Sequence, residues 1–144
     1  MTREEWDDCD DAGGLMIVVS RAHVRGAITR RRLVQVMLRC VEWQAYLLPQ
    51  KALTALADLT AWAHGAVDVD LADVRGRLFA VFTGIEQRKL GPAAFAVSVA
   101  YAAIDAEDLH AGHYASNAAF NAGDASAALC DVIRDEIAFD EVKP

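Results

Sequence analysis

Residues 91–123 read GPAAFAVSVAYAAIDAEDLHAGHYASNAAFNAG. Pro92 suits the first turn of a helix and Gly123 suits a helix end. Alanine is the strongest helix former and has almost no side chain, so neighbouring helices can approach such a segment closely. The stretch Ala93–Ala122 therefore predicts one long helix, or one helix broken once, at the centre of an all-α bundle.

The rest of the chain also carries helical signals. Thr2 and Glu5 form a capping-box pattern that predicts a short helix from about Arg3 to Cys9. Apolar residues recur at helical spacing in four further segments. These run from Thr29 to Leu48, from Pro49 to His64 with Gly65 as its C-terminal cap, from Asp68 or Asp70 to Gly84, and from Asp124 or Ser126 to Ala138.

Three segments are harder to interpret. Residues 10–14 read as a turn, and residues 140–144 read as a frayed tail. The apolar run Leu15–Val19 fits a buried strand or a short buried helix, and periodicity does not separate the two. A lone strand would have no partner elsewhere in the chain, which favours the helix. We expect one all-helical domain over residues 1–144, a single bundle of five to seven helices.

Composition limits the function classes. The 144 residues are 54% hydrophobic and carry a net charge of −7. No apolar run reaches the ~20 residues that a membrane-spanning helix needs, and the first residues are acidic where a signal peptide is basic. The three scattered cysteines do not form a disulfide or zinc pattern. We expect a cytoplasmic bacterial protein with reduced cysteines and no membrane partner.

Charge is unevenly distributed along the chain. Residues 1–11 carry six acids, and residues 21–39 carry six arginines and no acid. The arginines lack the interleaved aromatic residues of a nucleic-acid surface, and overall acidity disfavours nucleic acid. We interpret the two blocks as pairing with each other and expect a partner with a basic surface. The arginines concerned are Arg21, Arg25, Arg30, Arg31, Arg32 and Arg39.

His110 and His113 are the sharpest chemical feature. They lie three residues apart and share a helix face, and Glu107-x-x-His110 is half of a carboxylate di-metal motif. No second copy of the motif is present, and only His23 and His64 remain as further imidazole ligands. Hydrogen-bonded histidines are the alternative, and we expect no metal and no cofactor.

Acid/base catalysis by His113 with Asp108 or Glu107 is a second chemical interpretation. The sequence supplies no nucleophile, oxyanion hole or substrate pocket beside these residues. We therefore do not expect an enzyme.

The chain resembles a known family along Leu59-Thr-Ala-Trp-Ala-His-Gly-Ala-Val, Leu71-Ala-Asp-Val-Arg75 and His113-x-Ala-x-x-Ala-Ala-Phe120. These motifs are similar to those of the all-helical immunity proteins of bacterial polymorphic-toxin systems. The matching positions are Trp62, Gly65, Arg75, His113, Ala118 and Ala119, while Phe120 stands where the family usually has Tyr. The opening Met1-Thr-x-x-Glu-Trp-x-x-Cys-x-Asp resembles uncharacterised Ala-rich planctomycete and myxobacterial proteins.

This resemblance implies a protein-binding antidote that blocks a toxin domain. An acidic helical bundle suits a basic active-site cleft, such as that of a nuclease, because complementary charge accelerates association. The expected contacts are Asp68, Asp70, Asp73, Asp105, Glu107 and Asp108. Two alternatives remain open. One is a scaffold or regulatory module that forms a homo-oligomer through the alanine-rich helix, and the other is a metal-dependent helical-bundle enzyme using His110 and His113.

Overall fold

The computed structural model describes residues 1–42, 48–86 and 126–144, with the backbone alone for residues 82–86. These residues form helices and no strand, which confirms the all-α class. The helices are α1 (Arg3–Asp7), α2 (Ala12–Val24), α3 (Arg30–Glu42), α4 (Gln50–Ala63), α5 (Leu71–Glu86), α8 (Ser126–Glu136) and α9 (Phe139–Val142). The predicted central helix, Ala93–Ala122, lies outside the described residues.

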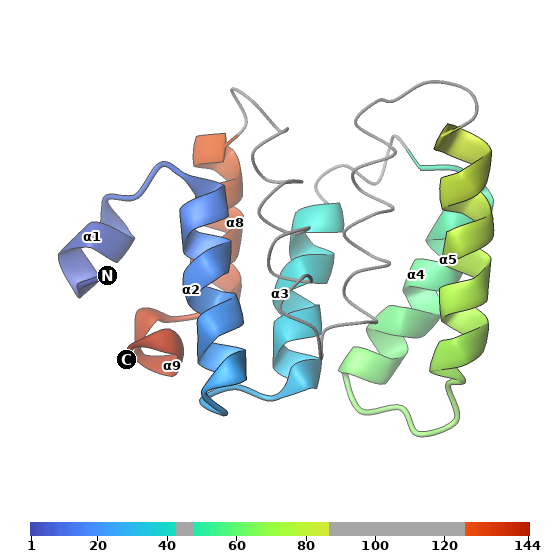
Figure 1. Cartoon of the computed structure of the whole chain (residues 1–144), viewed down its shortest axis with the longest axis horizontal. Helices are drawn as coiled ribbons and strands as arrows, with labels where there is room; N and C mark the ends of the chain where they lie inside the picture. The colour runs from blue at the N-terminus through green and yellow to red at the C-terminus, as the bar shows by residue number, and fades with distance from the viewer. Residues whose placement is uncertain (43–47, 87–125) are drawn as a thin grey trace.

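The described helices pack in a row (Figure 1). Helices α2, α3 and α8 pack against one another, α4 packs on α3, and α5 packs on α4. The short helix α9 packs on α2, and both chain ends lie on the side of the molecule away from α5.

One apolar core runs through the described helices. Buried apolar residues recur at helical spacing in α3, α4, α5 and α8, so each of these helices turns one face toward the core. Its largest fully buried side chains are Trp6, Leu15, Met16, Leu33, Met37, Leu59, Leu78, Ile133 and Ile137.

Side-chain caps mark the starts of several helices. Thr2 Oγ1 accepts the Glu5 backbone N–H at 3.2 Å and Glu5 Oε2 accepts the Thr2 N–H at 2.6 Å, which confirms the predicted capping box. Asp70 Oδ1 accepts the Ala72 N–H at 3.0 Å and so caps α5, one of the two caps expected there.

The predicted turn over residues 10–14 is wrong for its second half, because α2 begins at Ala12. Asp11 Oδ1 accepts the Gly13 N–H at 3.0 Å, and Ser126 Oγ accepts the Ala12 N–H at 3.0 Å. These bonds satisfy backbone donors that would otherwise be unpaired at the helix start, so two glycines are tolerated there. The run Leu15–Val19 lies within α2, which confirms the helix and excludes the strand.

Two glycines end helices in the same way. Gly26 (φ 77°) follows α2, and Gly65 (φ 108°) follows α4 as predicted. Behind α4, the Ala66 N–H donates to Ala61 O at 3.0 Å and the Gly65 N–H donates to Trp62 O at 3.0 Å. This is the Schellman arrangement, whose left-handed residue favours glycine.

Two other predicted boundaries need correction. Leu48 lies in a bend rather than at the end of a helix, and Pro49 precedes α4 in extended conformation. Proline lacks the N–H that a continuing helix would need, and it restricts the residue before it to extended backbone. The predicted frayed tail over residues 140–144 is also wrong, because most of it belongs to α9. Phe139 and Val142 are buried there, and Arg25 donates to Val142 O at 2.8 Å.

Candidate partner-binding surface

Several predicted site residues cannot be placed. His110 and His113, the two metal-ligand candidates, lie outside the described residues, as do Asp105, Glu107 and Asp108. Within residues 1–42, 48–86 and 126–144, no three histidine, cysteine or acidic side chains form a group suited to a metal ion.

The other predicted contact acids lie together at the start of α5. Asp70 is the α5 cap, and Asp73 Oδ2 accepts from Arg77 Nε at 3.0 Å, as its spacing predicts. Asp68 is exposed and its carboxylate makes no hydrogen bond or ion pair with any described residue. Two of the three acids therefore have structural roles, and Asp68 has none among the described residues.

Most arginines of residues 21–39 bind other residues of the same chain. Arg32 forms ion pairs with Glu136 at 2.8 Å and with Glu141 at 3.0 Å, and Arg39 pairs with Glu42 at 2.5 Å and with Glu136 at 3.6 Å. For these arginines the expected pairing with the acidic N-terminus is wrong, since their partners lie in α3, α8 and α9. The sequence pattern does not indicate ion pairs between residues about a hundred positions apart, such as Arg32 with Glu136.

The ion pair between Arg32 and Glu141 shifts the pKa values of both residues. Hydrogen bonding to Glu141 raises the pKa of Arg32. The same bond lowers the pKa of Glu141. A guanidinium with several carboxylate and carbonyl partners fixes α3 against the C-terminal segment.

Two further arginines, Arg30 and Arg31, lie over the ring of Trp62. The guanidinium carbon of Arg31 lies 4.6 Å from the centre of the Trp62 ring, and that of Arg30 lies 5.6 Å away. Arg31 also donates to Trp62 O. These contacts join the start of α3 to the end of α4 through cation–π attraction.

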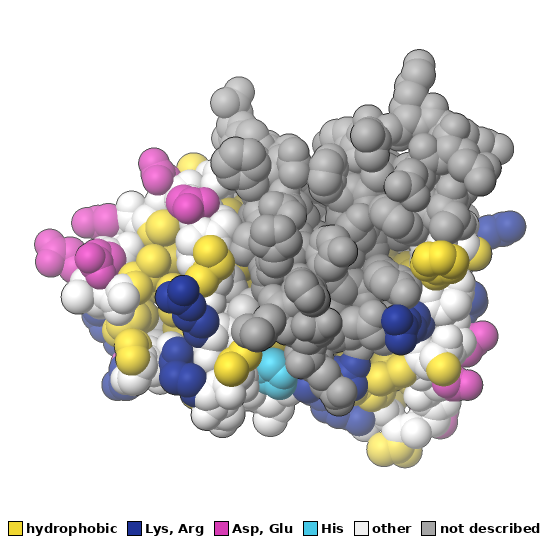
Figure 2. Space-filling model, viewed as in Figure 1, with side chains coloured by type: hydrophobic (Ala, Val, Ile, Leu, Met, Phe, Trp, Pro, Cys, Tyr) yellow, Lys and Arg dark blue, Asp and Glu magenta, His cyan; other side chains and the backbone are white. Residues whose placement is uncertain are grey.

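The acids of the N-terminus remain free once the arginines are used elsewhere. Four of them are exposed and make no side-chain hydrogen bond or ion pair with any residue that the structure describes. These four residues are Glu4, Asp7, Asp8 and Asp10, and we call them the N-terminal acidic patch. Figure 2 shows acidic side chains gathered at this end of the molecule. Sequence reasoning missed the patch because it expected the nearby arginines to neutralise these acids.

The helix α1, which carries part of the acidic patch, is fixed to the rest of the protein by several contacts. Trp6, on the opposite side of α1, is 2% exposed, and its ring centre lies 6.0 Å from that of Phe139. Arg134 of α8 donates to Trp6 O at 3.1 Å and also to Cys9 O. Arg3 pairs with Asp140 at 2.8 Å. A short helix that would be unstable alone is thereby held with its acids facing solvent.

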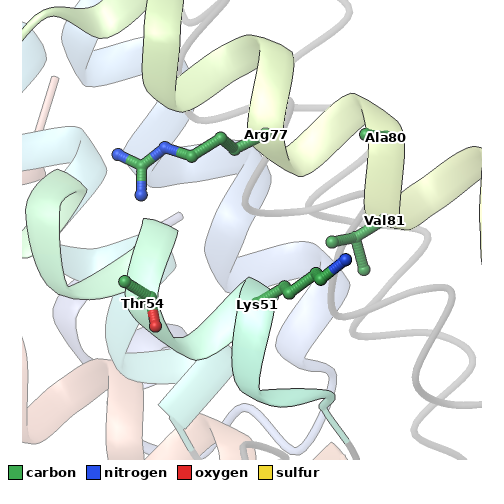
Figure 3. A pocket seen from close by; sticks show the side chains of 5 residues that line it. All are labelled: Lys51, Thr54, Arg77, Ala80 and Val81. Atoms are coloured by element: carbon green, nitrogen blue, oxygen red, sulfur yellow. The ribbon is translucent and has the colours of Figure 1, made fainter.

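A pocket of about 360 Å³ lies between α4 and α5 (Figure 3). Lys51 and Thr54 line it from α4, and Arg77, Ala80 and Val81 line it from α5. Its polar groups are largely engaged: Thr54 Oγ1 donates to Gln50 O at 3.0 Å, and Arg77 pairs with Asp58 as well as Asp73. The described residues of the lining include no histidine, cysteine or carboxylate, and we base no catalytic proposal on this pocket.

No disulfide joins Cys9, Cys40 and Cys130, as expected, and two of the three thiols are poor nucleophiles. Burial raises the pKa of Cys130 to about 11. Burial likewise raises the pKa of Cys40 to about 12. Both thiols therefore stay protonated near neutral pH, whereas reaction and metal binding need the thiolate.

None of the described helices has both the length and the apolar character required to cross a bilayer. Comparison of the chain with protein-family models, curated proteins and solved structures gave no match.

Proposed function

We propose that this chain is a protein-binding antidote that docks on the basic surface of a toxin domain through its N-terminal acidic patch. The observation that carries the proposal is the segregation of charge. Arginines of α3 and α8 are bound to acids, carbonyl groups or an aromatic ring of the same chain, whereas Glu4, Asp7, Asp8 and Asp10 face solvent without partners.

Such a surface suits a basic partner for two physical reasons. A cluster of like charges steers an oppositely charged protein into contact and raises the association rate. In addition, α1 is fixed by Trp6 and Arg134, so little conformational entropy is lost when the patch is covered. The resemblance to immunity proteins points to a toxin as the partner.

The first test is retrieval of the partner from lysate of the source organism at moderate salt, followed by mass spectrometry. Two double variants carry the same change in net charge. Asp7→Lys/Asp8→Lys alters the patch, and Asp68→Lys/Asp135→Lys alters exposed acids on the α4–α5 connection and on α8. Circular dichroism verifies that both variants are folded.

We expect the native protein and the second variant to retain one stoichiometric protein that carries a toxin-like domain, and the patch variant to lose it. The recovered domain should be inhibited by the native chain in an activity assay. Equal retention by both variants would reject the patch as the contact surface. A retained partner whose activity is unaffected by binding would reject the antidote function.

A further inference from the structure

The outward face of α2 is apolar yet uncovered. Ile17 is 41% exposed and Val24 is 65% exposed, whereas the opposite face of the helix is buried in the core. Arg21 lies between them, and the three residues share one side of the helix because they are four and three positions apart. We call Ile17, Arg21 and Val24 the outer face of α2.

Arg21 differs from most of its neighbours in sequence. Arg25, Arg31 and Arg32 all donate hydrogen bonds to residues of the same chain. The guanidinium of Arg21 is exposed and makes neither a hydrogen bond nor an ion pair within the part of the chain that the structure describes. Arginine is enriched at protein interfaces, and the centre of an interface is more apolar than the rest of a protein surface.

Opposite charges lie at the two ends of this face. Asp7, Asp8 and Asp10 of the acidic patch precede α2, and Arg21 lies in its last turn. The helical rise places Arg21 about 15 Å beyond the start of α2, on the far side of Ile17 from the acids. Figure 2 shows acidic side chains at one end of this part of the molecule, with basic side chains set apart from them on the same face.

We propose that two copies of this chain associate through the outer faces of their α2 helices, packed antiparallel about a two-fold axis. In this arrangement Arg21 of each copy lies beside the acidic patch of the other, so each charge contact occurs twice. Ile17 lies near the middle of the helix and meets the same region of the second copy, and Val24 is covered. Parallel packing would instead oppose Arg21 to Arg21.

A second copy fits this face because the face is complementary to itself. Together with the acidic patch that precedes α2, it carries the apolar centre and both charges that a two-fold interface requires. A helix of 13 residues is about 20 Å long, so the contact is smaller than a standard interface of ~1,600 Å². The dimer is therefore expected to be weak, concentration-dependent and sensitive to salt.

Sedimentation equilibrium of the purified protein over a range of concentrations tests the proposal without any other partner. The native protein is expected to show a monomer–dimer equilibrium that weakens at high salt. Ile17→Asp should give monomer only. Val67→Asp is the matched control, because Val67 is 92% exposed on the α4–α5 connection, and it should leave the equilibrium unchanged. Circular dichroism checks that both variants are folded.

A charge exchange tests the antiparallel geometry. Arg21→Glu alone should lose most of the dimer, since acids then oppose acids. A variant with Asp7→Lys, Asp8→Lys and Asp10→Lys should also lose it, because lysines then oppose Arg21. Mixing the two variants should restore a dimer containing one copy of each, since both charge contacts become favourable.

Three results would each overturn the proposal. These are a native protein that is monomeric at every concentration, a dimer unaffected by Ile17→Asp, and the absence of a mixed dimer when the native dimer does form. The assay contains only this chain, so these results leave the antidote function to the lysate experiment. A dimer of this geometry would compete with a toxin for the acidic patch.

Discussion

At the scale of single residues, arginine holds this protein together. Arg32, Arg25 and Arg134 each reach a backbone carbonyl or a carboxylate more than a hundred residues away along the chain. The planar guanidinium offers five donors in a fixed geometry, so one side chain can satisfy several acceptors at once. These contacts are partly shielded from water, which makes them stronger than ordinary surface ion pairs.

Glu141 should make stability depend on pH. Its carboxylate binds Arg32, which lowers its pKa below the ordinary value of 4.5, and bonds to Lys143 and Arg3 lower that of Asp140 below 3.8. Because the folded state favours the ionised forms, their contribution is complete above these ordinary values and is lost as pH falls through the lowered ones. Urea denaturation at a series of pH values should show the free energy of unfolding falling below about pH 4.5.

The variant Glu141→Gln should be less stable than the native protein near neutral pH and should show a shallower loss on acidification. Glu4→Gln is the control, because Glu4 is exposed and its carboxylate makes no bond within the described residues. An identical acid dependence in native protein and Glu141→Gln would show that Arg32 does not tie down the C-terminal segment.

At the scale of helices, several helix ends are fixed by caps formed between residues that lie close together in the sequence. Glycine plays two different roles in these elements. Gly65 has φ 108°, whereas Gly76 lies inside α5. A Cβ added at either position would meet no atom within 4 Å. Any effect of alanine is therefore conformational rather than steric.

Gly65→Ala should destabilise the protein by about 1 kcal/mol or more, because alanine disfavours positive φ. Gly76→Ala should stabilise it by about 0.5–1 kcal/mol, because alanine loses less backbone entropy in a helix. Urea denaturation measures both changes. Shifts of the same sign would contradict this account of the α4 end.

Sequence predicted the helices well for the same local reason. The capping box of Thr2 and Glu5, the stop at Gly65 and the pair of Asp73 with Arg77 each involve residues no more than four apart. The start of α2 was missed because part of its support, Ser126, lies 114 residues away. The three-residue spacing of Phe139 and Val142 was an available signal for α9.

At the scale of the whole molecule, the last residues close the core over the first helix. Phe139 is 9% exposed, lies against Trp6 and is covered by Arg3, whose guanidinium carbon is 5.3 Å from the ring centre. Val142 is fully buried beside α2. The segment 139–142 is thus part of the folded unit and not an appendage.

Phe139→Ala should destabilise the protein by about 3 kcal/mol, because it removes a buried ring and leaves a cavity beside Trp6. Val67→Ala, at a position 92% exposed, should change stability by less than about 0.5 kcal/mol. Thermal and urea denaturation measure both. A negligible effect of Phe139→Ala would mean that the tail is frayed after all.

The candidate surface was less predictable than the fold. Whether an acid is free depends on where every arginine points, and that is decided by tertiary packing. Arg32 pairs with Glu136 and Glu141 although acids of the N-terminus are nearer along the chain. Sequence reasoning named Asp68, Asp70 and Asp73 alike as contacts, and in the structure Asp70 and Asp73 have structural roles.

The contact between the first and last helices also bears on how the chain can be re-engineered. Arg3 and Asp140 lie 2.8 Å apart, so the two termini are near neighbours. A short flexible linker could join them, and new ends could be opened in the exposed connection between α4 and α5. Such a circular permutant would keep every described helix intact and would leave the outer face of α2 and the acidic patch away from the new ends.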